Sequence, residues 1–118
     1  MIEIEGDDIR IPRGDTGAVT FGVNTTYTFA DTDRALFSVK SPSGELLISD
    51  TYQIINNEFT VPFRVDTTNK WAIGTYQYDV RFLMSTHWDS DGNITGYDVV
   101  DTPKRPRNIQ ILNTVGEV

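Results

Sequence analysis

Hydrophobic and polar residues alternate along most of the chain. In the stretch EFTVPFRV, the apolar side chains of Phe59, Val61, Phe63 and Val65 fall on one face and the other side chains on the opposite face. A period of two residues is the signature of a half-buried β-strand. The same alternation recurs in GAVTFGV, in RALFSVK, in YQYDVRFLM and around Ile109 and Ile111. We therefore expect a chain built mainly from short strands.

Turn-forming residues separate these predicted strands. SPSG at 41–44 favours a hairpin, and the pair NN at 56–57 tolerates the left-handed backbone of a tight turn. DSDGN at 89–93 separates two further runs. One helical turn is expected in DTTNKWAIG, with Asp66 or Thr67 as its cap. TPKRPRN, with its two prolines, either is a linker or begins the last edge strand.

Many short strands at near-regular spacing predict an all-β fold, an antiparallel sandwich. The 118 residues suffice for one domain, and we expect a single domain over residues 1–118 because no internal repeat divides them. With no cysteine in the chain, the sandwich would have no disulfide and no thiolate metal ligand.

The charge and the hydropathy pattern exclude several functional classes. The net charge of -7 repels nucleic acid phosphates, so we expect no nucleic acid partner. No apolar run approaches the length of a transmembrane helix, so we expect no membrane insertion. The acidic start MIEIEGDDIR lacks the apolar core of a signal peptide, which favours synthesis in the cytoplasm without export by the general route.

One stretch carries a more specific pattern than alternation. Gly74 and Tyr76 match the Asp-x-Gly-x-Tyr-x-Cys pattern of the tyrosine corner in immunoglobulin domains, with Tyr78 in place of the cysteine and Ala72 in place of the aspartate. The resemblance implies an immunoglobulin-like sandwich of about seven to nine strands. In it, Tyr76 would bury its ring and bond its hydroxyl to the turn backbone, and Tyr78 would fill the space between the sheets.

Three longer stretches, taken in order, resemble small structural proteins of tailed phages and prophages, including the N-terminal domains of baseplate upper proteins. They are IRIPRGDTGAVTFGV, ALFSVKSPSGELLISD and FTVPFRVDTTNKWAIGTYQYDVRF. The resemblance implies a non-enzymatic tail or baseplate component, located in the virion or in the bacterial cytoplasm before assembly. Its partners would be other protein subunits or further copies of itself, and we expect no cofactor. The alternative function is a carbohydrate-binding or adhesin-type recognition module.

The tripeptide Arg-Gly-Asp at 13–15 has two interpretations. Integrin recognition needs the tripeptide at the tip of an exposed loop, whereas a turn between two strands needs Gly14 for its backbone angle and Asp15 to bond nearby amides. A strand begins almost immediately after it, so we expect the structural role.

Residues that could carry chemistry are few. DSDGN lacks the glycine and glutamate spacing of an EF-hand, so we interpret it as a hairpin tip. His87 is the single histidine, and no G-x-S-x-G nucleophile motif accompanies it. Glu45 and Glu58 would serve glycoside hydrolysis only at a suitable separation. We expect no catalytic residue and no metal site.

Candidate partner contacts come from three places. Leu46, Leu47 and Ile48 break the alternation, so at least one apolar side chain should face outward. Trp88 is expected in a polar loop, with Tyr97 nearby in sequence, where it either forms an exposed sugar contact or folds over the open end of the sandwich. Trp71 should be buried. The basic cluster of Lys104, Arg105 and Arg107 could dock on an acidic partner or protect a strand edge.

Overall fold

A computed structural model of the chain describes residues 1–22, 28–68 and 70–113, without the side chains at positions 65, 66, 85 and 98–105. The alternating segments form strands because each strand can then bury one face and leave the other in water. The strands are β1 (Glu3–Glu5), β2 (Asp8–Pro12), β3 (Gly17–Gly22), β4 (Arg34–Lys40), β5 (Leu46–Gln53), β6 (Glu58–Phe63), β7 (Gly74–Trp88) and β8 (Ile94–Leu112), with one helical turn, α1 (Val65–Thr68), between β6 and β7.

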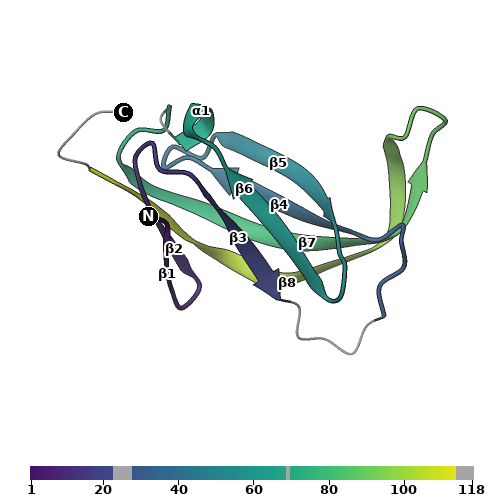
Figure 1. Cartoon of the computed structure of the whole chain (residues 1–118). Helices are drawn as coiled ribbons and strands as arrows, with labels where there is room; N and C mark the ends of the chain where they lie inside the picture. Colours follow the sequence, from purple (N-terminus) through teal and green to yellow (C-terminus); the bar gives the residue numbers. More distant parts are fainter. Residues whose placement is uncertain (23–27, 69, 114–118) are drawn as a thin grey trace.

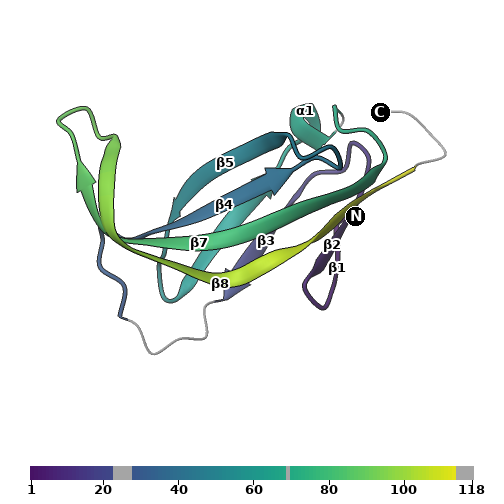
Figure 2. The same cartoon turned by 180° about the vertical axis from the view of Figure 1, so that it is seen from behind.

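The described strands form two sheets (Figures 1 and 2). The larger has the order β1-β2-β8-β7-β4-β5, and the smaller pairs β3 with β6. All neighbours are antiparallel except β2 and β8, which run parallel with Ile9 opposite Ile109 and Ile11 opposite Ile111. The all-β sandwich with largely antiparallel sheets is confirmed, and the parallel pair of β2 and β8 is a feature that the sequence did not predict. Alternation shows which face of a strand is buried and does not show the direction of its neighbour.

Aromatic side chains join the two sheets. The ring of Phe37 from β4 is fully buried, and its centroid lies 5.8 Å from that of Phe21 on β3 and 5.5 Å from that of Tyr78 on β7. Phe63 on β6 meets Phe37 edge to face at 6.2 Å. The small sheet therefore packs on one face of the large sheet, and the core lies between them (Figure 1).

Strands β7 and β8 extend beyond the sandwich. β4 pairs with β7 no further than Leu83, and β2 pairs with β8 only over 109–112. The segment 84–97, here called the ribbon, projects from one end of the molecule (Figures 1 and 2). The radius of gyration of 15.3 Å accordingly exceeds the value of about 13.5 Å expected for a compact domain of this length. Trp88 is the last residue of β7, so its assignment to a polar loop is wrong.

Two prolines of β8 lie where the ladder is irregular. β8 advances by three residues while β7 advances by two, first between Tyr78 and Val80 and again between Val80 and Phe82. Pro106 lies in the first of these β-bulges and Pro103 in the second. A proline has no N–H to donate, so sheets tolerate it at bulges and free edges. TPKRPRN is therefore part of the last strand and not a linker, and among the described strands only β7 pairs with it over this stretch.

The predicted turns are present. In the β4–β5 hairpin, the Ser41 amide donates to the Glu45 carbonyl at 2.8 Å. Asn56 and Asn57 both have positive φ, at 52° and 60°, in the turn that leads to β6. The helical turn is also present, but α1 begins at Val65, so the two residues proposed as its cap lie inside it. These two, Asp66 and Thr67, follow Arg64, whose carbonyl accepts the first helical bonds.

Candidate functional site

The Arg-Gly-Asp tripeptide forms the turn between β2 and β3. Gly14 is buried and has a φ of 89°, and the Asp15 amide donates to the Pro12 carbonyl at 2.9 Å. The fully buried Thr68 hydroxyl donates to the Asp15 carbonyl at 3.0 Å. From the sequence we expected the Asp15 carboxylate to accept a bond from a nearby backbone amide. In the structure it contacts the amino group of Met1. A tight turn with a buried glycine is not the exposed loop tip that integrin recognition needs.

The tyrosine corner predicted from Gly-x-Tyr is present. The ring of Tyr76 is buried, and its hydroxyl donates to the carbonyl of Ala72 at 2.8 Å. The buried Trp71 stacks on this ring with centroids 5.2 Å apart. Gly74 has a φ of 155°, a backbone that residues with a side chain rarely adopt. These four residues fix the entry of β7 into the core and have a structural role.

Tyr78 occupies the space between the sheets, as its position in place of the cysteine implied. Its ring lies 5.9 Å from Phe21 across the sandwich, and its hydroxyl donates to the Asp7 carbonyl. Burial raises the pKa of Tyr78 to about 12, with smaller contributions from the carboxylates of Asp7 and Asp8 and an opposing one from Arg107. The phenol is therefore held neutral, which suits a structural role.

The two edges of the large sheet differ in how they are protected. The β1 edge has three residues, two of them glutamates, and Arg10 of β2 pairs with Glu5 at 2.9 Å. The β5 edge has eight residues, no proline and a single charged side chain, Asp50. Short charged strands discourage edge-to-edge pairing, and long uncharged strands invite it. β5 is thus the less protected edge of this sheet. In the small sheet, β6 carries Pro62.

A β-bulge explains the apolar run at the start of β5. Leu46 pairs with Lys40 and Ile48 pairs with Val39, so Leu47 is an extra residue on β5. Leu46 is 53% exposed and Leu47 is 36% exposed, whereas Ile48 packs against the core. The expectation that at least one of the three faces outward is confirmed, and two leucines lie together at the beginning of the edge strand.

The ribbon carries the second exposed apolar group. Trp88 and Tyr97 are 37% and 50% exposed, and Tyr97 lies opposite Thr86 on the same face of the ribbon. The indole N–H of Trp88 donates to the Thr86 hydroxyl at 2.7 Å. The Arg34 guanidinium lies 4.8 Å from the Trp88 ring centre. Trp88 is therefore held against the end of the sandwich while part of its ring stays open to solvent.

Two of the groups considered for chemistry, the DSDGN stretch and the glutamate pair, do not form the site that each would need. Asp89 accepts bonds from the amides of Asp91 and Asn93 at 3.0 and 2.8 Å, so DSDGN is a hairpin tip. Glu45 and Glu58 flank β5, whose eight residues span about 26 Å, well beyond the carboxylate separations of glycoside hydrolases. Over the described part of the chain, no cluster of three His, Cys, Asp or Glu residues could hold a metal ion.

The basic cluster is only partly described. Arg107 lies 3.3 Å from the Asp7 carboxylate, so its charge is shared with the turn between β1 and β2. The side chains of Lys104 and Arg105 lie outside the described residues. Both earlier interpretations, partner docking and edge protection, remain predictions for these two.

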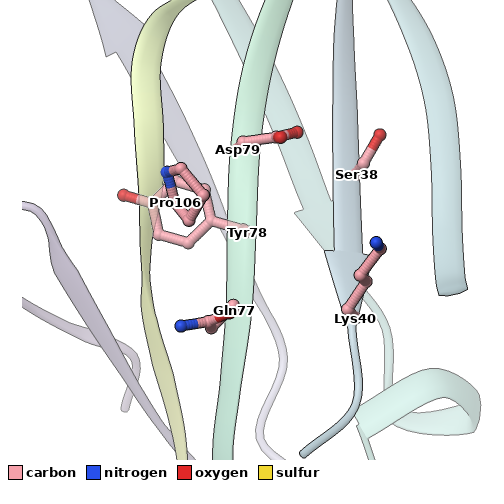
Figure 3. Close-up of a pocket in the computed structure, with 6 residues that line it drawn as sticks. All are labelled: Ser38, Lys40, Gln77, Tyr78, Asp79 and Pro106. Atoms are coloured by element: carbon pink, nitrogen blue, oxygen red, sulfur yellow. The ribbon is translucent and has the colours of Figure 1, made fainter. Parts of the chain in front are cut away.

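A shallow pocket of about 140 Å³ lies on the outer face of the large sheet (Figure 3). Ser38 pairs with Asp79 and Lys40 with Gln77 across β4 and β7, and Pro106 closes one side from the β8 bulge. Sequence reasoning missed this pocket. The feature that indicates the pocket is a small side chain, Ser38, between longer side chains on one face of β4. It could be recognised only after the pairing of β4 with β7 was known.

Comparisons with protein-family models, curated proteins and solved structures find no match to this chain. In the described part of the chain, no helix has the length and apolar character to cross a membrane.

Proposed function

We propose that the chain is a non-enzymatic structural protein of a phage or prophage, an immunoglobulin-like component of a tail or baseplate. It joins neighbouring subunits through the β5 edge. The phage assignment rests on the resemblance of 9–23, 35–50 and 59–82 to such proteins. The assembly role rests on the exposed edge.

The topology supports the immunoglobulin-like assignment. The order β8-β7-β4-β5 corresponds to G-F-C-C′ of a variable-type domain, and the pair β3-β6 corresponds to B and E. Phe37 lies where such domains carry the core tryptophan of strand C, and the Phe21–Tyr78 contact lies where they carry the disulfide. The tyrosine corner at Tyr76 is a third common feature.

One observation carries the assembly role: the β5 edge presents Leu46 and Leu47 to solvent, while the opposite edge is short and acidic. An unprotected edge strand is a template for pairing with another chain. Burying it in an assembly removes both the unpaired backbone groups and the exposed leucines from water.

The test uses the source strain and two matched variants. An antibody against the chain should detect it in purified tailed particles, and Leu46→Lys should reduce incorporation without changing the circular dichroism spectrum. Ile4→Lys, at a residue 57% exposed on the opposite edge, is the control and should incorporate normally. Absence from particles, or equal incorporation of both variants, would reject the proposal.

The alternative, a carbohydrate-binding module, is favoured by the exposed aromatic pair Trp88 and Tyr97. Aromatic rings held rigid and open on one side can stack on sugar rings, and Trp88 is fixed by Thr86 and Arg34. A glycan array should then show binding that Trp88→Ala abolishes and that Leu46→Lys leaves intact. An array with no signal would remove this candidate.

A further inference from the structure

The free side of β5 offers backbone groups to a partner. β5 is the last strand of the large sheet, and β4 is its one strand neighbour among the residues that the structure describes (Figure 2). In an antiparallel pair, every second residue directs its N–H and C=O away from the neighbour. An eight-residue strand without proline therefore presents an uninterrupted set of donors and acceptors.

The two faces of β5 differ in chemistry. Ile48, Asp50 and Tyr52 lie opposite Val39, Phe37 and Ala35, so they point to the core side of the sheet. Ser49, Thr51 and Gln53 point to the outer side. The Asp50 carboxylate is exposed and has no ion-pair or hydrogen-bond partner among the residues that the structure describes. Along the core-side face, the order is thus apolar, acidic, apolar.

The charge around this edge is negative. Residues 41–57 contain Glu45 and Asp50 and no lysine, arginine or histidine, and the whole chain has a net charge of -7. The cations of β4, Arg34 and Lys40, lie opposite the two ends of β5, whereas Phe37 lies opposite Asp50. Tyr52 is next to Asp50 on the same face; burial, and secondly the Asp50 carboxylate, raise the pKa of Tyr52. A basic segment is the complement of this surface.

Pairing of two β5 strands from identical copies is unfavourable by the same chemistry. Residues that face each other across two paired strands point to the same face of the sheet. In a pair of identical antiparallel strands, the two-fold axis must therefore pass beside one residue, which faces its own copy. Centring on Asp50 places the two carboxylates opposite each other, which is destabilising. Centring on Ser49 places each carboxylate opposite Ile48, and centring on Thr51 places it opposite the uncharged Tyr52. A different chain can offer a cation at this point, and a second copy cannot.

We propose that β5 accepts an extended segment of another protein as a further strand of the large sheet, with a lysine or arginine opposite Asp50. Apolar residues two positions to either side contact Ile48 and Tyr52, and polar residues occupy the outer face. The segment therefore has the pattern apolar-x-basic-x-apolar, where x is polar. The inference rests on the proposed function, since it specifies the partner of the same edge.

Synthetic peptides test the inference without the natural partner. The probe is the acetylated, amidated heptapeptide TVTKTVT, and its counterpart TVTETVT carries glutamate in place of lysine. The lysine peptide should bind the wild-type chain about tenfold more tightly, since a favourable cross-strand charge pair is replaced by a repulsive one. Isothermal titration calorimetry measures the affinity of each peptide, and hydrogen exchange should show new protection at β5 amides.

The matched variants separate position from net charge. Asp50→Lys should reverse the preference toward the glutamate peptide, whereas Glu45→Lys changes the net charge equally but lies outside the strand, so it should keep the lysine preference. Thermal melts confirm that both variants fold. Equal effects of the two variants, binding without β5 protection, or no binding of either peptide would overturn the inference.

The outcomes distinguish this inference from the proposed function. If the lysine peptide binds as expected but Leu46→Lys incorporates normally into particles, the function fails and strand addition stands. If Leu46→Lys blocks incorporation but neither peptide protects β5, strand addition fails and the assembly role stands.

Discussion

The two halves of the β7–β8 pair lie in different surroundings. Over Tyr76–Phe82, β7 lies between β4 and β8 and is covered by the small sheet, and alternate side chains are 2–4% exposed. In the ribbon, among the described strands, β7 and β8 pair only with each other; Met84 at its base still packs against the core, and Trp88 is 37% exposed. One pair of strands is thus a core element at one end and an exposed arm at the other.

The difference shows that alternation does not by itself create a core. The even-numbered face of β7 continues from Phe82 through Thr86 to Trp88, but the small sheet does not extend over the ribbon (Figure 1). There Trp88 donates a hydrogen bond to Thr86, the buried Thr86 hydroxyl donates to the Thr32 carbonyl, and the Arg34 guanidinium lies over the Trp88 ring. Local stability follows buried contact, so the ribbon should open more easily than the body.

The largest effect is expected from Phe37→Ala in the body. Phe37 is fully buried and its ring contacts Phe21, Phe63 and Tyr78. Removing a buried phenyl ring costs about 3–5 kcal/mol, a large part of the stability of a small domain. Urea unfolding should show this loss in the free energy of unfolding. A loss under about 1 kcal/mol would mean that the cross-sheet aromatic contacts do not hold the body together.

A middle effect is expected from Tyr78→Phe, which removes the hydrogen bond to Asp7. The loss should be about 1 kcal/mol at neutral pH. The pKa of Tyr78 is raised from 10.0 to about 12 in the folded chain, so the unfolded chain loses this proton first as the pH rises. The wild type is therefore destabilised between pH 10 and 12, and Tyr78→Phe should lack this part of the decline. Parallel stability curves for the two proteins above pH 10 would contradict it.

The smallest effect on global stability is expected from Trp88→Ala in the ribbon. The cation–π contact with Arg34 is worth about 0.5–1 kcal/mol at an exposed site, and the ring is only partly buried. Urea midpoints should shift little, while amides of the ribbon should exchange faster with deuterium. A loss as large as that of Phe37→Ala would show that the ribbon unfolds together with the body.

Local features of the fold could be predicted from sequence. The hairpin turn at 41–44, the paired asparagines at 56–57 and the tip at 89–93 are present where predicted, because turn geometry depends on the few residues within the turn. Tyr76 could be placed in the core with its hydroxyl bonded, since the motif spans only a few residues.

The candidate site could be predicted only in part. The outward position of Leu46 and Leu47 followed from the broken alternation. Trp88 was assigned to a loop because the polar residues 89–93 follow it directly, although cross-strand pairing carries β7 as far as this residue. The pocket beside Ser38 and the pairing of Arg107 with Asp7 depend on residues far apart in sequence, so no local pattern indicated them.

The sequence by itself determined the all-β class, most of the strands and the turns between them, because strand period and turn chemistry are properties of consecutive residues. Only the tertiary structure decided that β2 lies parallel to β8, that the prolines of β8 fall in bulges, and that β5 is the less protected edge of the large sheet. Strand neighbours and register are selected by the packing of the whole core. Many chain orders satisfy the same alternation, and they differ only in which distant side chains they bring together.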